Sequence, residues 1–414
     1  MTDITTAAPV IAVDKVQAVA LAVCTYYFGV WLKGRIGVLS RYSIPSPVVG
    51  GMSFAIIVSI LENYNVLKLQ IDSTLQTVLM LGFFTTIGLM ASLRVVKDGG
   101  KLLLGFLLAV TVLVFLQNGM GMAIADWMGF DKHYGILAGS VSMMGGLGTA
   151  AAFGPYFEET YGITGGTAVA VTAATFGMVA ALLIGGPFGE WCIRRYKVKT
   201  PNEVAQPEPA LHIPDDMNAS ITEEHAAEKP NFTHEIMKAV SITALAMGLG
   251  TIVSNFLGHY ITLPAYIGAM IVATIIRNVG DFSGMYKVEG KGLNAVADIT
   301  LVLFVTMAIN NLKLHELVHL ALPLVVILAA QTVLMIIFAW AILFSAFGRN
   351  YDAVMLSVGG IGFSMGATAN GLANMQAISE KYGSSPRAWL IVSVVGAFLI
   401  DLINAVVITW FGTL

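Results

Sequence analysis

Charged residues are scarce in this sequence. Only 11% of its 414 residues are Asp, Glu, Lys or Arg, whereas a typical soluble domain has about 25%. Hydrophobic residues make up 57% of the chain, and the mean hydropathy is +0.79. This composition is that of a polytopic membrane protein and not of a soluble domain. No Lys/Arg cluster of the kind that follows phosphates is present, so nothing in the sequence indicates a nucleic-acid partner.

Cysteine and a basic N-terminal start are also lacking. The only two cysteines, Cys24 and Cys192, fall in separate apolar stretches, so we expect buried, inert thiols and no disulfide. Two acids, Asp3 and Asp14, precede the first base, Lys15. A cleavable signal peptide begins with basic residues instead, so we expect the first membrane span itself to direct insertion.

Long apolar runs are abundant. A window of about 19 residues predicts five membrane spans in each half of the chain and therefore an all-α polytopic fold. The predicted spans are 15–32, 46–63, 75–93, 102–125 and 165–192, and then 237–258, 262–278, 297–312, 320–347 and 387–412. Between the halves, residues 193–232 are rich in proline and acids, a composition that cannot bury itself and predicts a loose linker.

A segment of 32 residues recurs without a gap at an offset of 221. It runs from Asp131 to Gly162 and again from Asp352 to Gly383, with eight identities that include Met144-Gly145 and Met365-Gly366. Paired apolar segments interrupted by glycine, at matching places in two halves, are the sequence mark of a secondary transporter and of its binding site. The other explanation is that these glycines only allow ordinary membrane helices to pack closely.

The distribution of Lys and Arg predicts the topology. If each glycine-rich segment enters the membrane and returns to the same side, and the N-terminus is outside, 18 of the 22 basic residues are cytoplasmic. The other four are outside, namely Lys15, Lys68, Lys132 and Lys313. The positive-inside rule favours this split. It predicts a first inverted repeat at 1–192, a cytoplasmic linker at 193–232 and a second inverted repeat at 233–414, with both termini outside. The re-entrant segments are expected at about 133–158 and 353–379.

The two glycine-rich segments are the predicted binding site. Non-helical backbone is tolerated at membrane depth only where protein or a water-filled cavity satisfies it. The N-terminus of a half-helix suits a carboxylate, whereas unwound carbonyls and hydroxyls suit Na⁺. A bulky side chain at Gly145 or Gly366 should block the opposite segment. The predicted substrate-binding residues are Gly145, Gly146, Leu147, Gly148, Thr149, Gly366, Ala367, Thr368, Asn370 and Gln117.

Polar side chains inside the spans are the candidate Na⁺ ligands. Asp401 lies within the last apolar span, and an intramembrane carboxylate is costly, so it is the first choice. Its alternative role is a structural pairing with a neighbouring helix. The predicted Na⁺ ligands are Asp401, Asn404, Asn118, Ser364 and Asn374.

One motif indicates a different chemistry. His315-Glu316-Leu317-Val318-His319 matches H-E-x-x-H, which on a helix would hold zinc and make the chain an intramembrane metalloprotease. The motif falls at the entrance of a span, Pro323 follows it, and a protease does not explain a duplicated chain. An amphipathic interfacial turn is the simpler interpretation.

The glycine-rich segments also resemble those of a known family. The stretches YSIPSPVVGG (42–51), LAGSVSMMGGLGTAAAF (137–153), FSMGATANGLANMQAISEKYG (363–383) and VGAFLIDLINA (395–405) are similar to those of the bacterial sodium/glutamate symporters, relatives of the 2-hydroxycarboxylate carriers. This resemblance covers nearly the whole chain. It implies two inverted five-span domains, a homodimer and an elevator-like mechanism. Leu147 stands where the family is expected to have His, and Ala369-Asn370 where it is expected to have Pro-Thr.

The sequence therefore predicts a transporter that imports glutamate with Na⁺ across the bacterial inner membrane. Na⁺ is the only expected cofactor, as the coupling ion, and the expected partners are the small-molecule substrate, membrane lipid and a second copy of the chain. A sodium-coupled carrier of another small carboxylate is the main alternative. A channel is a further one, since it would show no Na⁺-driven accumulation.

Overall fold

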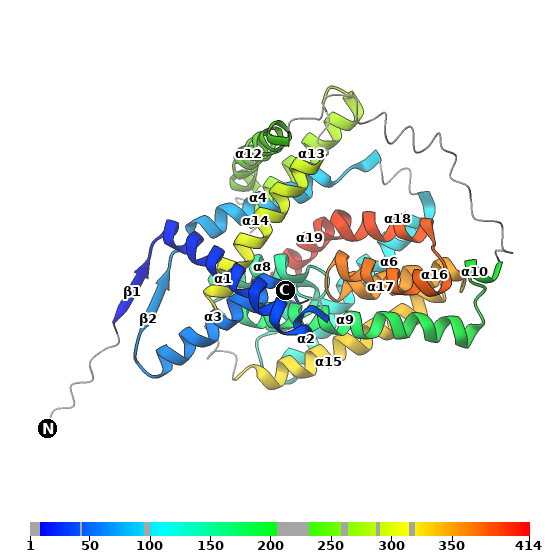
Figure 1. The fold of residues 1–414 in the computed structure, drawn as a ribbon, viewed down its shortest axis with the longest axis horizontal. Coiled ribbons are helices and arrows are strands. Elements are labelled where there is room, and N and C mark those ends of the chain that lie inside the picture. The colour runs from blue at the N-terminus through cyan, green and yellow to red at the C-terminus, as the bar shows by residue number, and fades with distance from the viewer. Residues whose placement is uncertain are drawn as a thin grey trace.

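The computed structural model describes residues 9–41, 44–94, 100–204, 232–257, 264–286, 290–313 and 319–414. Within them the chain is mostly helical (Figure 1). The helices of the first half are α1 (Lys15–Arg35), α2 (Gly37–Arg41), α3 (Ser46–Asn63), α4 (Thr74–Met90), α6 (Gly100–Trp127), α7 (Lys132–Ile136), η1 (Leu137–Val141), α8 (Gly146–Tyr161), α9 (Gly166–Tyr196) and α10 (Pro201–Val204). Those of the second half are α12 (Phe232–Leu257), α13 (Ala265–Ser283), α14 (Lys291–Asn310), α15 (Ala321–Phe338), η3 (Ala339–Phe344), α16 (Tyr351–Ser364), α17 (Thr368–Tyr382), α18 (Pro386–Val394), η4 (Val395–Leu399) and α19 (Ile400–Gly412).

All ten predicted apolar spans coincide with helices. Local chemistry sets several of their starts. The Asp14 carboxylate accepts hydrogen bonds from the N–H groups of Val16 (2.8 Å) and Gln17 (3.0 Å) and so caps α1. The Ser385 hydroxyl accepts from Ala388 N–H (3.3 Å) at the start of α18, where Pro386 occupies the first helical position.

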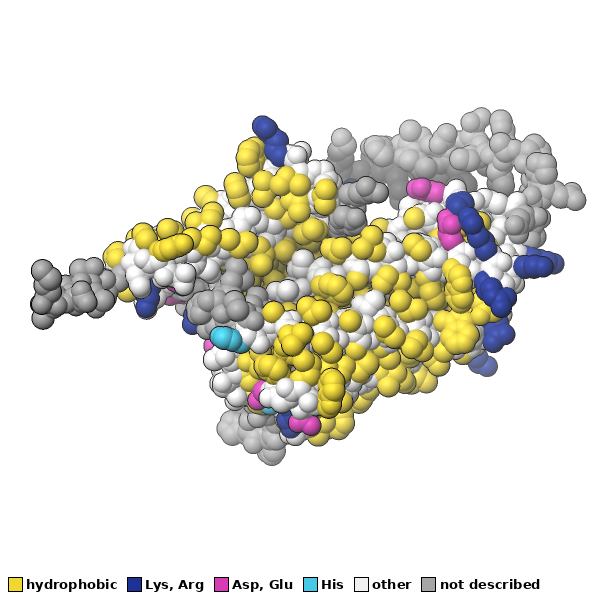
Figure 2. Space-filling model, turned by 90° about the horizontal axis from the view of Figure 1, so that it is seen from below, with side chains coloured by type: hydrophobic (Ala, Val, Ile, Leu, Met, Phe, Trp, Pro, Cys, Tyr) yellow, Lys and Arg dark blue, Asp and Glu magenta, His cyan; other side chains and the backbone are white. Residues whose placement is uncertain are grey.

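Seven helices of the described residues are long and apolar enough to cross a membrane: α1, α3, α6, α9, α12, α14 and α15 together with η3. The helix α4 is apolar but has only 17 residues, and α19 continues from α18 through η4. Large hydrophobic side chains are exposed along these helices, and Figure 2 shows them covering much of the visible face. Because such a surface is stable only in lipid, the chain is a membrane protein.

A short parallel sheet departs from the predicted all-α fold. It consists of β1 (Val10–Val13) and β2 (Lys68–Ile71), which pair from Val10 with Lys68 to Val13 with Ile71. The strands lie beside each other at the end of the molecule near the start of α1 (Figure 1). Both are too short to cross a membrane and contain β-branched residues, which favour an extended backbone.

One cysteine lies where we did not expect it. Cys192 is buried, whereas Cys24 is exposed on α1. The prediction of a buried thiol at Cys24 was wrong, because the other described residues leave this face of α1 uncovered.

The helices form two groups that mix the two halves of the sequence. The six-helix group contains α1, α3, α4, α12, α13 and α14, which contact one another. The broken-helix group contains α6, α7, η1, α8 and α9 from the first half and α15, η3, α16, α17, α18, η4 and α19 from the second. In Figure 1 the broken-helix group lies on the side of the molecule that holds α10, and the six-helix group lies on the side of the β-strands. The segments singled out in the sequence all belong to this group.

The two groups touch through mainly apolar side chains. Phe153 of α8 packs edge-on against Tyr266 of α13, with ring centroids 5.5 Å apart. Gly148 of α8 lies against Phe83 and Leu301, so a Cβ added there would be 3.0 Å from the Phe83 ring. The first turn of α8 therefore faces the six-helix group directly.

Candidate functional site

Each glycine-rich segment is a helix that breaks and folds back. We call α7, η1 and α8 the first broken pair, and α16 and α17 the second. At the far end of the first pair, the Tyr134 hydroxyl donates to Thr164 O (2.7 Å), and His133 stacks on Tyr161 with ring centroids 4.1 Å apart. The two ends of this pair therefore lie together, and its break at residues 142–145 lies at the opposite end.

The second broken pair is closed in the same way. The Tyr351 hydroxyl donates to Gly383 O (2.5 Å), and the Ser385 hydroxyl donates to the Asp352 carboxylate (2.6 Å). Its break falls between Ser364 and Thr368. In both pairs the chain thus leaves and returns at one end and changes direction at the other.

The two breaks touch each other. Gly146 has φ +63° and lies so close to the second break that an added Cβ would be 2.5 Å from Gly366 O. On the other side, Gly177 of α9 lies directly under Met365 O, with no room for a side chain between them. The sequence comparison of the halves selects Gly145 as the partner of Gly366, but a Cβ on Gly145 would meet Thr149 instead. The glycine that permits the close approach is Gly146.

A first set of polar atoms surrounds Ser140 in η1, where Gly139 also leaves helical geometry. Ser140 N–H donates to Asn118 Oδ1 (2.9 Å), and Asn404 Nδ2 donates to Ser140 O (3.1 Å). All three residues are buried. Ser140 Oγ, Asn118 Nδ2 and Asn404 Oδ1 are buried and have no hydrogen-bond partner among the described residues.

A second set surrounds the end of α16. Gln117 Nε2 donates to Ser364 O (3.0 Å), and Gln331 Nε2 donates to Gln117 O (2.7 Å). Within the part of the chain that the structure describes, Gln117 Oε1, Gln331 Oε1 and Ser364 Oγ are buried and lack a partner. Gln117 and Asn118 are consecutive residues of α6, so this helix contributes one residue to each set.

Counting contacts of the described residues only, these sets hold five unpartnered oxygen atoms: Ser140 Oγ, Asn404 Oδ1, Gln117 Oε1, Gln331 Oε1 and Ser364 Oγ. Leaving one buried polar atom without a partner costs about 1–3 kcal/mol, so a concentration of five needs a reason. Oxygen is the ligand that hard cations prefer, and neutral oxygens from side chains suit a monovalent ion. These oxygens are therefore candidate ligands for a small cation.

Sequence reasoning named Asn118, Asn404, Ser364 and Gln117 but missed Ser140 and Gln331. Gln331 is the only amide within the 18 residues of α15, and it lies near the middle of that helix. A lone amide in such an apolar run was the available signal. Ser140 gave no comparable signal, because serine is common in membrane helices.

The other two predicted Na⁺ ligands lie outside these sets. Asn374 Nδ2 donates to Ala181 O (3.0 Å) and packs against Gly185, which fixes α17 to α9. Asp401 is half-buried in the first turn of α19, one turn before Asn404, and has no hydrogen bond or ion pair to any described residue. The helix α19 contacts α13, and η4 contacts α4, so Asp401 lies on a helix that borders the six-helix group.

The remaining predicted substrate residues form the two helix starts. Thr149 is buried in the first turn of α8, and Leu147 is half-buried beside Gly148. Thr368 donates to Gly396 O (2.5 Å), and Asn370 Nδ2 donates to Met178 O (2.9 Å). These bonds fix the start of α17. The helices α8 and α17 both begin at the breaks, where the first N–H groups of a helix have no partner within it.

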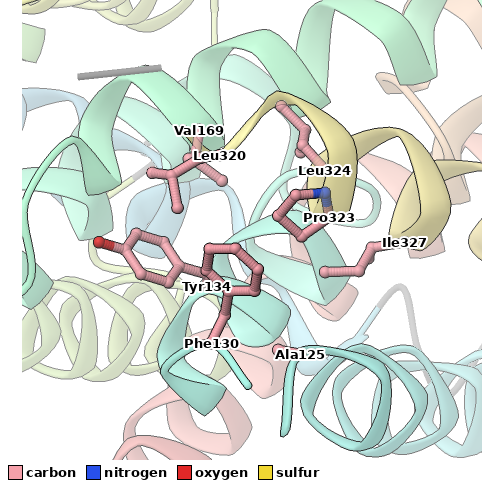
Figure 3. A pocket seen from close by; sticks show the side chains of 8 residues that line it. All are labelled: Ala125, Phe130, Tyr134, Val169, Leu320, Pro323, Leu324 and Ile327. Carbon is pink, nitrogen blue, oxygen red and sulfur yellow. The ribbon is translucent and has the colours of Figure 1, made fainter. Parts of the chain in front are cut away.

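A separate apolar pocket does not fit a charged substrate. It has a volume of about 10 Å³ and is shown in Figure 3. The side chains that line it carry no charge, and only the Tyr134 hydroxyl among them is polar. They are Ala125, Phe130, Tyr134, Val169, Leu320, Pro323, Leu324 and Ile327.

The zinc motif can be described only in part. His315, Glu316, Leu317 and Val318 lie outside the described residues, and His319 lies in the turn before α15. In the described ranges, no group of three His, Cys, Asp or Glu side chains is arranged to hold a metal ion.

Comparison with known proteins identifies the family. The family model described as sodium/glutamate symporter matches residues 11–384. The sodium/glutamate symporter of Escherichia coli (strain K12) is 38% identical over 404 residues, which cover 95% of this chain and 96% of that protein. The sodium/glutamate symporter of Haemophilus influenzae (strain ATCC 51907 / DSM 11121 / KW20 / Rd) is 36% identical over 395 residues, or 94% and 95% of the two chains. The chain therefore belongs to the sodium/glutamate symporter family, whose named members are transporters and not enzymes.

Proposed function

We propose that this protein imports glutamate together with Na⁺, and that both bind where the two breaks meet. The observation that carries the proposal is the contact of Gly146 with Gly366 O, together with five buried oxygens that have no partner among the described residues. Membership of the sodium/glutamate symporter family supports the choice of ion and substrate. A sodium-coupled carrier of another small carboxylate would use the same geometry.

In this proposal the broken pairs are re-entrant hairpins of two inverted repeats. A shift of 221 residues carries α7 and η1 onto α16, and α8 onto α17. Lys132 lies at the closed end of the first pair, and Lys381 and Arg387 flank the closed end of the second. Lys and Arg gather at the end of the molecule that holds α10 (Figure 2), which supports a cytoplasmic side there and both termini outside. The repeats would be 1–192 and 233–414, joined by a cytoplasmic linker.

The substrate carboxylates would bind at the starts of α8 and α17. Each start offers N–H groups and the positive end of a helix dipole. Thr149 adds a hydroxyl at the start of α8, and Asn370 an amide at the start of α17. Ala367 and Thr368 are half-buried, whereas Ala369 is exposed, so the second start is accessible to a ligand.

Na⁺ would bind to the oxygens around Ser140 and Ser364. Ser140 and Ser364 belong to different broken pairs, and Asn404 comes from α19. A cation bound among them would draw the two pairs and α19 together. Ion binding would then complete the substrate site, which is the coupling that symport requires. Asp401, one turn before Asn404, supplies a nearby negative charge in this scheme.

The two helix groups support an elevator-like movement. The broken-helix group would carry both ligands while the six-helix group stays fixed in the membrane. Side chains such as Phe153, Tyr266 and Phe83 line their contact, and apolar rings can slide without breaking hydrogen bonds.

A homodimer through exposed apolar faces of the six-helix group is a further part of the proposal, and the mass of the purified protein in detergent tests it.

Uptake of labelled L-glutamate into proteoliposomes tests the function. An inward Na⁺ gradient should drive accumulation above the external concentration, and an equal gradient of choline should not. A panel of unlabelled small carboxylates then tests specificity, because the preferred substrate must compete most strongly. Uptake that only follows the gradient of glutamate would indicate a channel, and a stronger competitor would indicate a different carboxylate.

A further inference from the structure

A polar cavity lies between the two helix groups at the end that holds the β-strands. Its volume is about 250 Å³. The six-helix group contributes Gln76, Asn311 and Lys313, and the broken-helix group contributes Glu158 and Thr167. The lining thus includes one cation and one carboxylate that come from different groups.

We propose that this cavity is an outer capture site for the transported amino acid. Lys313 binds a carboxylate of the ligand, and Glu158 binds its α-ammonium group. The site rests on the proposed function, which supplies a substrate that carries both kinds of charge. The amides of Gln76 and Asn311 lie on the same wall, and Asn311 Nδ2 donates to Gln76 Oε1 (3.4 Å). They offer further hydrogen bonds to the polar ligand.

The Glu158 carboxylate is held in a defined position. Its Oε1 accepts a hydrogen bond from Thr167 N–H (2.7 Å) at the start of α9. This bond caps α9, and it also fixes the charged group at the cavity wall. Lys313 follows the end of α14, so the position of its backbone is set by that helix. A carboxylate and an ammonium group carried by the two opposing helix groups match the zwitterion of an amino acid.

The cavity is separate from the site at the breaks. Glu158 is ten residues after Gly148 on α8, so the two are about 15 Å apart along the helix. Gly148, which lies on α8 between the first break and Glu158, packs on Phe83 and Leu301 of the six-helix group. Because the two groups each supply part of its wall, the cavity changes shape whenever they move relative to each other. A ligand held there is therefore positioned to enter when the apolar layer at Phe83 opens.

The test compares two lysine variants from the same end of the molecule. Lys313→Gln removes the cation of the cavity, and Lys68→Gln removes an exposed lysine of β2 as the matched control. Initial rates of labelled L-glutamate uptake are measured in right-side-out membrane vesicles. Lys313→Gln should raise KM about five-fold with little change in the maximal rate, the effect of losing one partly exposed ion pair. Raising the ionic strength with choline chloride should reduce the difference.

Inside-out vesicles separate this site from the central one. Lys313→Gln should leave KM unchanged there, because the cavity is not on the path from that side. An equal rise of KM in both vesicle types, or a KM that matches Lys68→Gln, would overturn the capture site. Wild-type vesicles without Na⁺-driven uptake would instead overturn the proposed function, and the capture site with it.

A second comparison tests the assignment of Glu158. Glu158→Gln should raise the KM for L-glutamate but leave the inhibition constant measured for glutarate as a competitor unchanged, since glutarate has no ammonium group. Retention of the folded monomer or dimer peak in size-exclusion chromatography controls for the loss of the α9 cap. Equal weakening of both ligands would show that Glu158 acts only through structure.

Discussion

The contact between the two breaks can be tested at a single atom. Gly146 is left-handed, with φ +63°, and an added Cβ would lie 2.5 Å from Gly366 O. We predict that Gly146→Ala strongly reduces Na⁺-driven uptake. Gly119→Ala is the matched control, because Gly119 is an exposed helical glycine of α6 with no atom near an added Cβ. There the change should be neutral or slightly stabilising.

The magnitude follows from two costs. A non-glycine residue in the left-handed region costs about 1–2 kcal/mol. Forcing an extra methyl group against a packed backbone costs about 1–3 kcal/mol more. Since about 1.4 kcal/mol corresponds to a factor of ten, the arrangement in which the breaks touch should become at least about 30-fold less populated. If that arrangement binds Na⁺ and substrate, the apparent affinity for both falls by a similar factor.

The assay is uptake of labelled L-glutamate over a range of Na⁺ concentrations in proteoliposomes. Size-exclusion chromatography of the purified variants shows whether each is folded. If Gly146→Ala is folded and its uptake at low Na⁺ is within two-fold of that of Gly119→Ala, the contact between Gly146 and Gly366 O is not needed for transport. The breaks would then be packed helix ends, and the site would have to be sought around Gln117, Asn118, Asp401 and Asn404.

Three further changes test the other assignments. Asp401→Asn should abolish uptake or raise its Na⁺ requirement strongly in a folded protein, because an amide keeps an oxygen but not the negative charge of the carboxylate, and unchanged Na⁺ dependence would exclude a role of Asp401 in Na⁺ binding. Gln331→Leu should raise the Na⁺ concentration for half-maximal uptake about ten-fold, as expected for one lost oxygen ligand, and an unchanged value would remove Gln331 from the site. His315→Gln combined with His319→Gln should leave uptake within a few-fold, and metal analysis should find no stoichiometric zinc; zinc lost in the double variant would support the protease instead.

Hydropathy predicted the helices well because each membrane span must satisfy its own backbone hydrogen bonds. The ten predicted spans and the two glycine breaks all correspond to elements of the structure. The strands β1 and β2 were not predicted, because each has only four residues and their pairing joins segments about 58 residues apart. Local sequence carries little information on so short and distant a pairing.

The way in which helices group was not predictable from spans alone. The sequence divides into two similar halves, but the structure combines α1, α3 and α4 with α12, α13 and α14. Length and hydropathy show that a helix can cross a membrane, but they do not specify which neighbours it packs against. Which of them pack together depends on side-chain shape at the contacts, such as the stacked rings of Phe84 and Tyr266, 4.3 Å apart.

The sequence singles out residues that the structure brings together at the two breaks, but it does not give their contacts. Glycine and intramembrane amides identify a region because each is costly in an apolar helix. The partner of each amide depends on tertiary structure. Asn404 bonds to Ser140, which also bonds to Asn118, and Gln331 bonds to Gln117. The Asn404–Ser140 and Gln331–Gln117 bonds each join residues more than 200 positions apart in the sequence. Asn374, with the same chemistry, fixes two helices instead.

The two breaks are related by the repeat but differ in backbone conformation, and this difference explains their residues. The offset of 221 pairs Gly146 with Ala367. Gly146 has φ +63°, whereas Ala367 is extended with φ −156°, a conformation open to any residue. We therefore predict an asymmetry: Ala367→Gly should retain most Na⁺-driven uptake, because it removes one half-buried methyl group and introduces no strain, while Gly146→Ala should not. The two variants are measured side by side in proteoliposomes of equal protein content. Equal loss of uptake in both would mean that the positions are sensitive to any change, and equal tolerance would mean that the left-handed turn at Gly146 is not needed for transport.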